Sequence, residues 1–65
     1  MTIVQVALLE GRPGEVKEQL IAELTDTVVR VLDAPRETVR VILNDVPDSH
    51  WGIGGVSRQK RNADG

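Results

Sequence analysis

GEVKEQLIAELTDTVVRVLD, residues 14–33, has the period of an amphipathic helix. Its apolar residues recur three and four positions apart, so they share one face, and charged residues occupy the others. Pro35 ends the pattern, because proline cannot continue the helical hydrogen bonds and biases Ala34 away from helical geometry. We expect a helix of roughly five turns here. Its predicted apolar face comprises Val16, Leu20, Ile21, Leu24, Val28, Val31 and Leu32.

Both flanks of this helix are aliphatic runs typical of β-strands. TIVQVALL at residues 2–9 is nearly continuous in apolar residues, which predicts a strand buried on both faces in a parallel sheet. TVRVILN at residues 38–44 alternates and predicts a strand with two distinct faces. One face holds Val39, Val41 and Leu43, and the other holds Arg40, Ile42 and Asn44. The order strand, helix, strand predicts an α/β fold, a single β-α-β unit with a right-handed crossover between parallel strands.

Glycine and proline mark the connections. EGRPG at residues 10–14 predicts a turn with Pro13 at the first helical position. The glycine-rich residues 51–56 predict a tight turn or short hairpin. Residues 58–65 are polar, and we expect a flexible tail there unless a neighbouring subunit holds it. The sequence shows no linker, so residues 1–65 are expected to form one domain.

The size of the chain favours association. A chain of 65 residues hides only about 60% of its unfolded surface on folding. It has no cysteine, which excludes disulfides and thiolate metal sites. A two-stranded sheet covered by one helix also leaves its second face bare. We therefore expect oligomerisation through the sheets.

The charge pattern argues against two classes of partner. The net charge of −2 is spread over mixed residues, whereas nucleic-acid binding draws on a concentrated basic surface. No apolar run approaches the roughly 20 residues that span a bilayer, and no signal-peptide pattern is present. We expect a soluble, cytoplasmic protein.

Two arginines and the single aromatic residue are the candidates for a binding site. Arg12 follows the first predicted strand, at the end where α/β sheets bind ligands, although a surface arginine is the simpler interpretation. Arg40 lies within the second predicted strand, where a guanidinium must form an intersubunit ion pair or face a pocket. Two such groups suit a dicarboxylate or an α-keto acid, since each can bind a carboxylate in a bidentate manner. Trp51 is either core filler or an apolar wall of that pocket.

Four segments of the chain resemble the smallest tautomerases, the 4-oxalocrotonate tautomerase family. They are Leu8-Leu9-Glu10-Gly11-Arg12, Leu32-Asp33-Ala34-Pro35, Val39-Arg40-Val41-Ile42 and Gly52-Ile53-Gly54-Gly55. The resemblance implies that β-α-β units pair into dimers and that three dimers form a hexamer. It also implies sites assembled from neighbouring subunits, without cofactor or metal.

The resemblance assigns roles to the three candidate residues. Arg12 would interact with a substrate carboxylate, and Arg40 would bind carboxylate and polarise the developing enolate. Trp51 would replace the family's usual phenylalanine as the pocket wall. The implied activity is that of an isomerase, which shifts a proton by a 1,3- or 1,5-transfer in a small enol or 2-hydroxy-dienoate carboxylate. By analogy with the family's best-known members, the setting is aromatic-compound degradation.

Thr2 is a departure from this family. Its members use the secondary amine of an N-terminal proline as the acid–base group. Removal of Met1 would leave the primary amine of Thr2 at the same site, and a free α-amine has a reference pKa of about 7.7–8.0. That value suits a weakened general base at neutral pH. An N-terminal threonine can also act as a hydroxyl nucleophile, but nothing else in the sequence supports a hydrolase.

Three functions stay open at this point. The first is a tautomerase in which the Thr2 amine replaces that of proline. The second is a non-catalytic or specialised subunit of a heterohexamer whose partner chain supplies the proline. The third is a scaffold protein that binds anions without turnover. Arg12, Arg40 and Trp51 together favour the first two, because a pure scaffold gains little from them.

Overall fold

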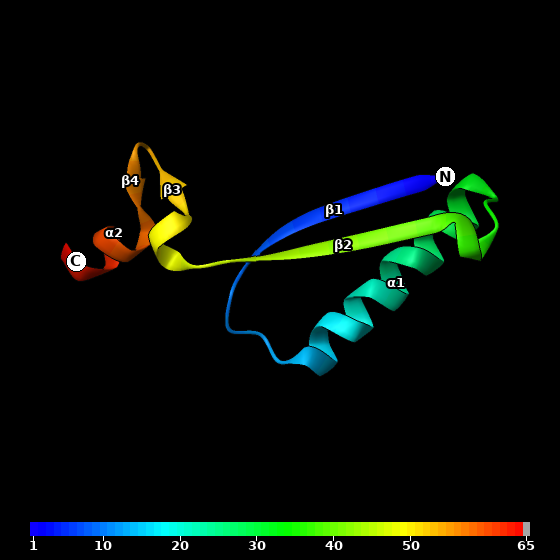
Figure 1. Ribbon diagram of the computed structural model, residues 1–65, viewed down its shortest axis with the longest axis horizontal. Helices are drawn as coiled ribbons and strands as arrows, with labels where there is room; N and C mark the ends of the chain where they lie inside the picture. The colour runs from blue at the N-terminus through cyan, green and yellow to red at the C-terminus, as the bar shows by residue number, and fades with distance from the viewer. Residues whose placement is uncertain (65) are drawn as a thin grey trace.

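A computed structural model describes residues 1–64 of the chain. Two long strands and one long helix form the body, and a small C-terminal arm, residues 48–64, projects from it (Figure 1). The elements are β1 (Thr2–Leu9), α1 (Gly14–Leu32), the 3₁₀ turn η1 (Arg36–Thr38), β2 (Val39–Val46), the 3₁₀ turn η2 (Asp48–His50), β3 (Gly52–Ile53), β4 (Val56–Ser57) and α2 (Arg58–Asp64). The predicted α/β fold, with one β-α-β unit and a C-terminal hairpin, is confirmed.

Strands β1 and β2 pair in parallel along all eight residues of each. β2 reaches Val46, beyond the predicted end at Asn44. The extension follows from the pairing, because Val46 lies opposite Leu9 and its carbonyl oxygen accepts a hydrogen bond from the Glu10 amide at 3.0 Å. The turn that leads to α1 therefore starts from a strand end that is held on its neighbour.

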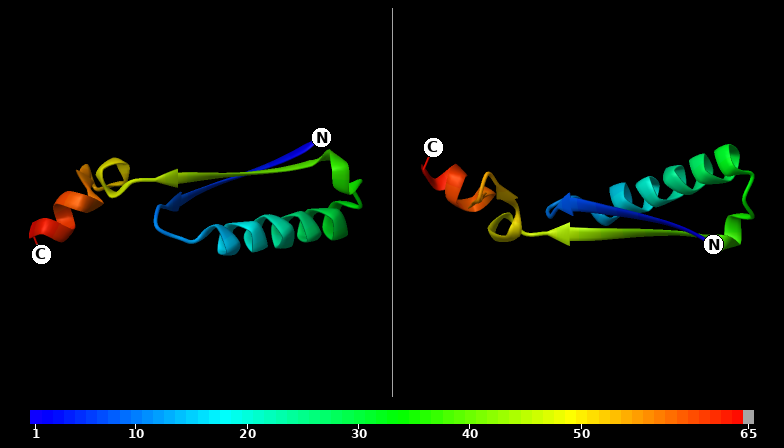
Figure 2. Two further views of the ribbon diagram at one scale, coloured as in Figure 1. Left: turned by 60° about the horizontal axis from the view of Figure 1, so that its bottom comes forward. Right: turned by 90° about the horizontal axis from the view of Figure 1, so that it is seen from above.

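Helix α1 covers one face of the sheet (Figure 2). Leu20, Leu24 and Val28 are half-buried, and Lys17 forms an ion pair with Asp45 of β2. Four residues of the predicted apolar face stay exposed in the single chain, because a sheet of two strands is too narrow to cover the whole face. The residues left exposed are Val16 (47%), Ile21 (37%), Val31 (63%) and Leu32 (59%).

The helix ends are set by local backbone geometry. Pro13 is the N-cap of α1 and not its first residue, and the helix begins at Gly14, where the predicted period of residues 14–33 begins. The Pro13 carbonyl oxygen accepts hydrogen bonds from the amides of Val16 and Lys17, at 3.1 and 3.4 Å. Asp33 ends the helix in the left-handed conformation, with φ of 52°.

The second face of the sheet is bare, as the two-strand pattern predicted. In the register, Ile3 lies opposite Arg40 and Gln5 lies opposite Ile42, and all four residues are exposed. Ile3 is 55% exposed and Ile42 is 42% exposed. The expectation that residues 2–9 are buried on both faces therefore does not hold within a single chain, where α1 covers only one of them.

The described part of the chain has almost no core by itself. Among the residues described, Val39 alone is buried, at 8% exposure. The radius of gyration is 15.4 Å, whereas a compact domain of this length has about 11 Å. The molecule extends over 47 × 24 × 14 Å, because the arm continues the line of β2 away from the helix (Figure 1). Such a shape exposes apolar surface that other chains can cover.

The arm contains the predicted hairpin and a helix that was not predicted. Strands β3 and β4 pair antiparallel around Gly54 and Gly55, whose φ angles of 61° and 87° favour glycine. Residues 58–65 were expected to form a flexible tail, but Arg58–Asp64 form helix α2, and Gly65 lies outside the described residues. Ser57 caps this helix, because its Oγ accepts a hydrogen bond from the Lys60 amide at 3.2 Å.

Neither helix in the described part of the chain combines the length and apolar character needed to cross a membrane.

Candidate functional site

The predicted site residues lie at the two opposite ends of the sheet. Thr2 and Arg40 belong to the starts of the strands, where Thr2 pairs with Val39 and Arg40 pairs with Ile3. Arg12 follows the far end of β1. A strand of eight residues measures roughly 26 Å, at about 3.3 Å per residue. Within one chain, Arg12 therefore cannot share a small ligand with Thr2 and Arg40.

Arg40 projects from the bare face of β2 and is exposed. Its Nη1 donates to the Glu37 carbonyl oxygen at 2.5 Å and contacts the Val39 carbonyl oxygen at 3.4 Å. Arg36 and Arg58 form ion pairs with carboxylates, but Arg40 forms none with the residues described. A guanidinium carries five N–H donors, so most of its capacity remains for an anion or for a neighbouring subunit.

Arg12 lies in the exposed turn between β1 and α1. Its Nη1 donates to the Leu9 carbonyl oxygen at 2.9 Å, which caps the end of β1. No carboxylate of the described residues forms an ion pair with it either. Arg12 is thus a second available guanidinium, with Gly11 before it at φ of 117° giving the turn its shape.

Trp51 is carried by the arm, at the same end of the sheet as Arg12. It is half-buried and follows η2 directly. Its amide donates to the Asp48 carbonyl oxygen at 3.3 Å, and its own carbonyl oxygen accepts a bond from the Arg58 amide at 2.7 Å. The four candidates therefore form two pairs, Thr2 with Arg40 and Arg12 with Trp51, about one strand length apart.

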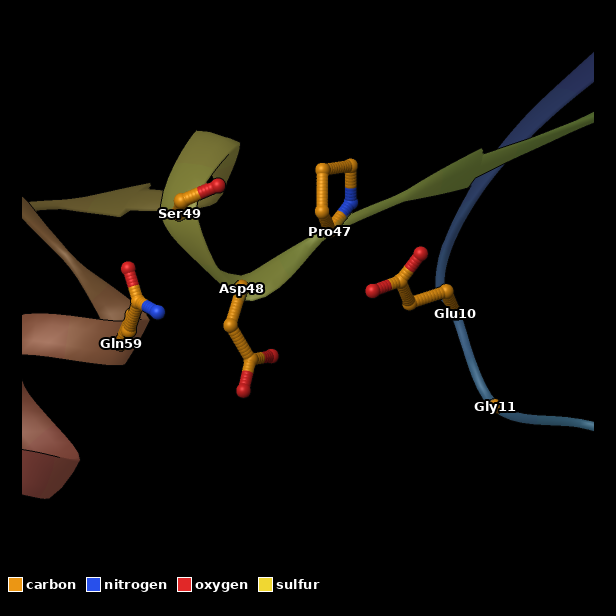
Figure 3. A pocket seen from close by; sticks show the side chains of 6 residues that line it. All are labelled: Glu10, Gly11, Pro47, Asp48, Ser49 and Gln59. Carbon is orange, nitrogen blue, oxygen red and sulfur yellow. The ribbon is translucent and has the colours of Figure 1, made fainter.

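A pocket of about 530 Å³ lies where the arm leaves the body (Figure 3). It is lined by Glu10, Gly11, Pro47, Asp48, Ser49 and Gln59, and none of the four candidates is among them. Figure 3 shows Glu10 on the β1 side and Asp48 with Gln59 on the arm side. Two carboxylates in the wall repel an anionic substrate, so this pocket is not the expected carboxylate site.

Comparison with known proteins gives concordant results at the levels of family, sequence and structure. The profile of a family described as Tautomerase enzyme matches residues 3–61. A 2-hydroxymuconate tautomerase of Pseudomonas putida is 50% identical over 62 residues, covering 95% of this chain and 98% of that protein. Among solved structures, a 4-oxalocrotonate tautomerase isozyme of Methylibium petroleiphilum superposes with a TM-score of 0.89 at 36% identity, covering 97% and 98% of the two chains. A heterohexameric 4-oxalocrotonate tautomerase of Chloroflexus aurantiacus gives a TM-score of 0.84 at 35% identity, covering 92% and 97%.

Proposed function

Because the chain belongs to the tautomerase enzyme family, we propose that it isomerises a small enol or 2-hydroxy-dienoate carboxylate by moving a proton between oxygen and carbon. The observation that carries this proposal is the register of the sheet, in which Thr2 begins β1 and Arg40 is the second residue of the neighbouring strand β2. The similarity to a 2-hydroxymuconate tautomerase supports a 2-hydroxy-dienoate as the substrate class.

In this proposal, removal of Met1 gives Thr2 a free primary amine at the start of β1. The amine accepts the proton of the substrate's 2-hydroxyl group and returns a proton to C3 or C5, which completes a 1,3- or 1,5-transfer. Arg40, one register position away on the neighbouring strand, binds a carboxylate and stabilises the negative charge that develops on the enolate oxygen. Neither step consumes a co-reactant.

The second pair of residues completes the site from another subunit. Arg12 binds the far carboxylate of the substrate, and Trp51 forms an apolar wall that excludes water. Their separation from Thr2 and Arg40 by about one strand length supports a site shared between chains. The bare sheet face with Ile3 and Ile42, together with the lack of a core, supports assembly of such a shared site.

Ketonisation of 2-hydroxymuconate, followed by its change in ultraviolet absorbance, tests the proposal. Arg40→Ala should lower kcat/KM by about 100-fold, the scale for losing a group that stabilises a developing oxyanion. Arg30→Ala is the matched control, because Arg30 is an exposed helix residue that loses the same group outside the site. Equal rates in the two variants would exclude Arg40 from the reaction.

The departure at Thr2 favours a second candidate, a specialised subunit of a hetero-oligomer whose partner chain supplies the proline. The similarity to a heterohexameric tautomerase supports this possibility. Its test is co-expression with a proline-bearing tautomerase chain, followed by co-purification and assay. Turnover only in the mixed assembly identifies the subunit role, and Arg40-dependent anion binding without any turnover identifies an anion-binding scaffold.

A further inference from the structure

Three residues of the arm form a closed ring of hydrogen bonds around the backbone of Trp51. The Trp51 amide donates to the Asp48 carbonyl oxygen at 3.3 Å, and the Arg58 amide donates to the Trp51 carbonyl oxygen at 2.7 Å. Nη1 of Arg58 closes the ring on Oδ1 of Asp48 at 2.9 Å. We propose that Asp48 and Arg58 are positioning residues, which hold Trp51 in the orientation in which it forms the apolar wall of the substrate site.

The ring constrains Trp51 because it uses both polar groups of its backbone. Either of these two backbone hydrogen bonds alone would leave Trp51 free to rotate about that bond. The Asp48–Arg58 pair ties the two partners together through a charge-assisted hydrogen bond, which is stronger than one between neutral groups. The side chain of Arg58 is 39% exposed and that of Asp48 is 43% exposed, so solvent weakens the pair without abolishing it.

A second set of contacts makes the rest of the arm rigid around this ring. Ser57 caps α2 through the Lys60 amide at 3.2 Å, which fixes the helix on which Arg58 is the first residue. Arg61 of the same helix donates from Nη1 to the Ile53 carbonyl oxygen at 3.1 Å and so ties α2 to the hairpin. Helix α2 is therefore held to the hairpin by Arg61 and to the Trp51 backbone by the Arg58 amide.

The position of the arm explains why these contacts within it would affect function. It projects from the body (Figure 1), and both backbone hydrogen bonds of Trp51 go to residues of the arm itself, Asp48 and Arg58. Trp51 is the chain's single aromatic residue, and no Phe or Tyr could replace it as an apolar wall. A small rotation of its backbone would therefore change the width of the site that the wall lines. This last step rests on the proposed function, whereas the ring itself does not.

The first experiment measures the ring without any substrate. Trp51 is the only tryptophan, so the fluorescence of the full-length protein reports on this residue alone. Arg58→Gln should move the emission to longer wavelength and raise acrylamide quenching, because losing the charge-assisted hydrogen bond loosens the ring around Trp51. Arg58→Lys, which keeps the charge, should recover part of the change. An unchanged spectrum in Arg58→Gln would overturn the proposal.

A matched control separates the ring from a general loss of charge. Arg36→Gln breaks the exposed Arg36–Asp26 ion pair, 2.5 Å long, at the other end of the body. It should leave the Trp51 emission as in the unmodified protein. If Arg36→Gln changes the emission as much as Arg58→Gln does, the effect is global and the ring is not its cause. Asp48→Asn combined with Arg58→Gln should change the emission no more than either variant alone, because each breaks the same bond.

The second experiment adds turnover and separates this inference from the proposed function. With 2-hydroxymuconate, Arg58→Gln should raise KM by about two- to fivefold and leave kcat nearly unchanged, the pattern of a lost binding contact. A fall in kcat at constant KM would contradict a positioning role. Emission changes in a protein that shows no turnover would support the ring and count against the proposed function instead.

Discussion

At position 2, a single side chain determines the type of amine that a tautomerase would use. Thr2 starts β1 beside Arg40, and its side chain is half-buried on the α1 side of the sheet. A proline there would present a secondary amine from the same backbone position. The difference between Thr2 and proline is thus chemical and leaves the strand pairing in place.

We therefore expect Thr2→Pro to raise kcat/KM for 2-hydroxymuconate by at least about tenfold, because a better-matched acid–base group contributes up to 10⁴-fold. Mass spectrometry of the intact protein should show that Met1 is absent. Thr2→Pro combined with Arg40→Ala serves as the control and should lose the gain. If Thr2→Pro leaves the rate unchanged while Met1 is absent, the start of β1 is not the acid–base site.

At the scale of elements, the hairpin of the arm depends on two glycines with positive φ. Gly54, at 61°, adopts a conformation that costs residues with a Cβ atom about 1–2 kcal/mol. Gly54→Ala should therefore destabilise the hairpin by that amount, measured as faster amide exchange at Ile53 and Val56. Gly52→Ala is the control, since a Cβ atom there meets no atom within 4 Å and φ is not positive. Equal exchange in both variants would refute the role of the turn.

Some of the helices and strands could be predicted from the sequence and others could not. The three- and four-residue period of 14–33 and the alternation of 38–44 predicted α1 and β2 to within two residues at each end. Local patterns were sufficient there because the periods of a helix and of a strand arise from residues only a few positions apart. The α2 helix was missed, although Ser57 before Arg58 is an N-cap signal. The helix has six polar residues and one alanine, Ala63, so no apolar period argued against a flexible tail.

The candidate site was predictable only as a set of residues. Sequence selected Thr2, Arg12, Arg40 and Trp51, but their separation into two pairs depends on strand pairing across the whole body. The Asp48–Arg58 contact joins residues ten positions apart and follows no periodic pattern, so no sequence rule identifies it. The place of Glu10 in the pocket wall could not be predicted from the sequence either, because only the fold brings the end of β1 close to the arm.

At the scale of the whole molecule, the bare sheet face should be an interface between chains. Ile42 is 42% exposed at the centre of β2, so Ile42→Asp would place a charge in that interface. We expect the variant to be monomeric, or partly unfolded, by light scattering coupled to size-exclusion chromatography. Ala22→Asp, which adds the same charge on the exposed side of α1, should keep the oligomer intact. An unaltered mass for Ile42→Asp would show that the face does not mediate assembly.

The near-absence of a core, with Val39 as the one buried residue among those described, has a consequence for the protein's abundance. If folding is completed only on assembly, stability depends on protein concentration, and every tenfold dilution removes about 1.4 kcal/mol for each association step. Newly made chains would stay sensitive to proteases until enough copies had accumulated. The cell would then hold either assembled protein above the concentration needed for assembly, or almost none of this protein below that concentration.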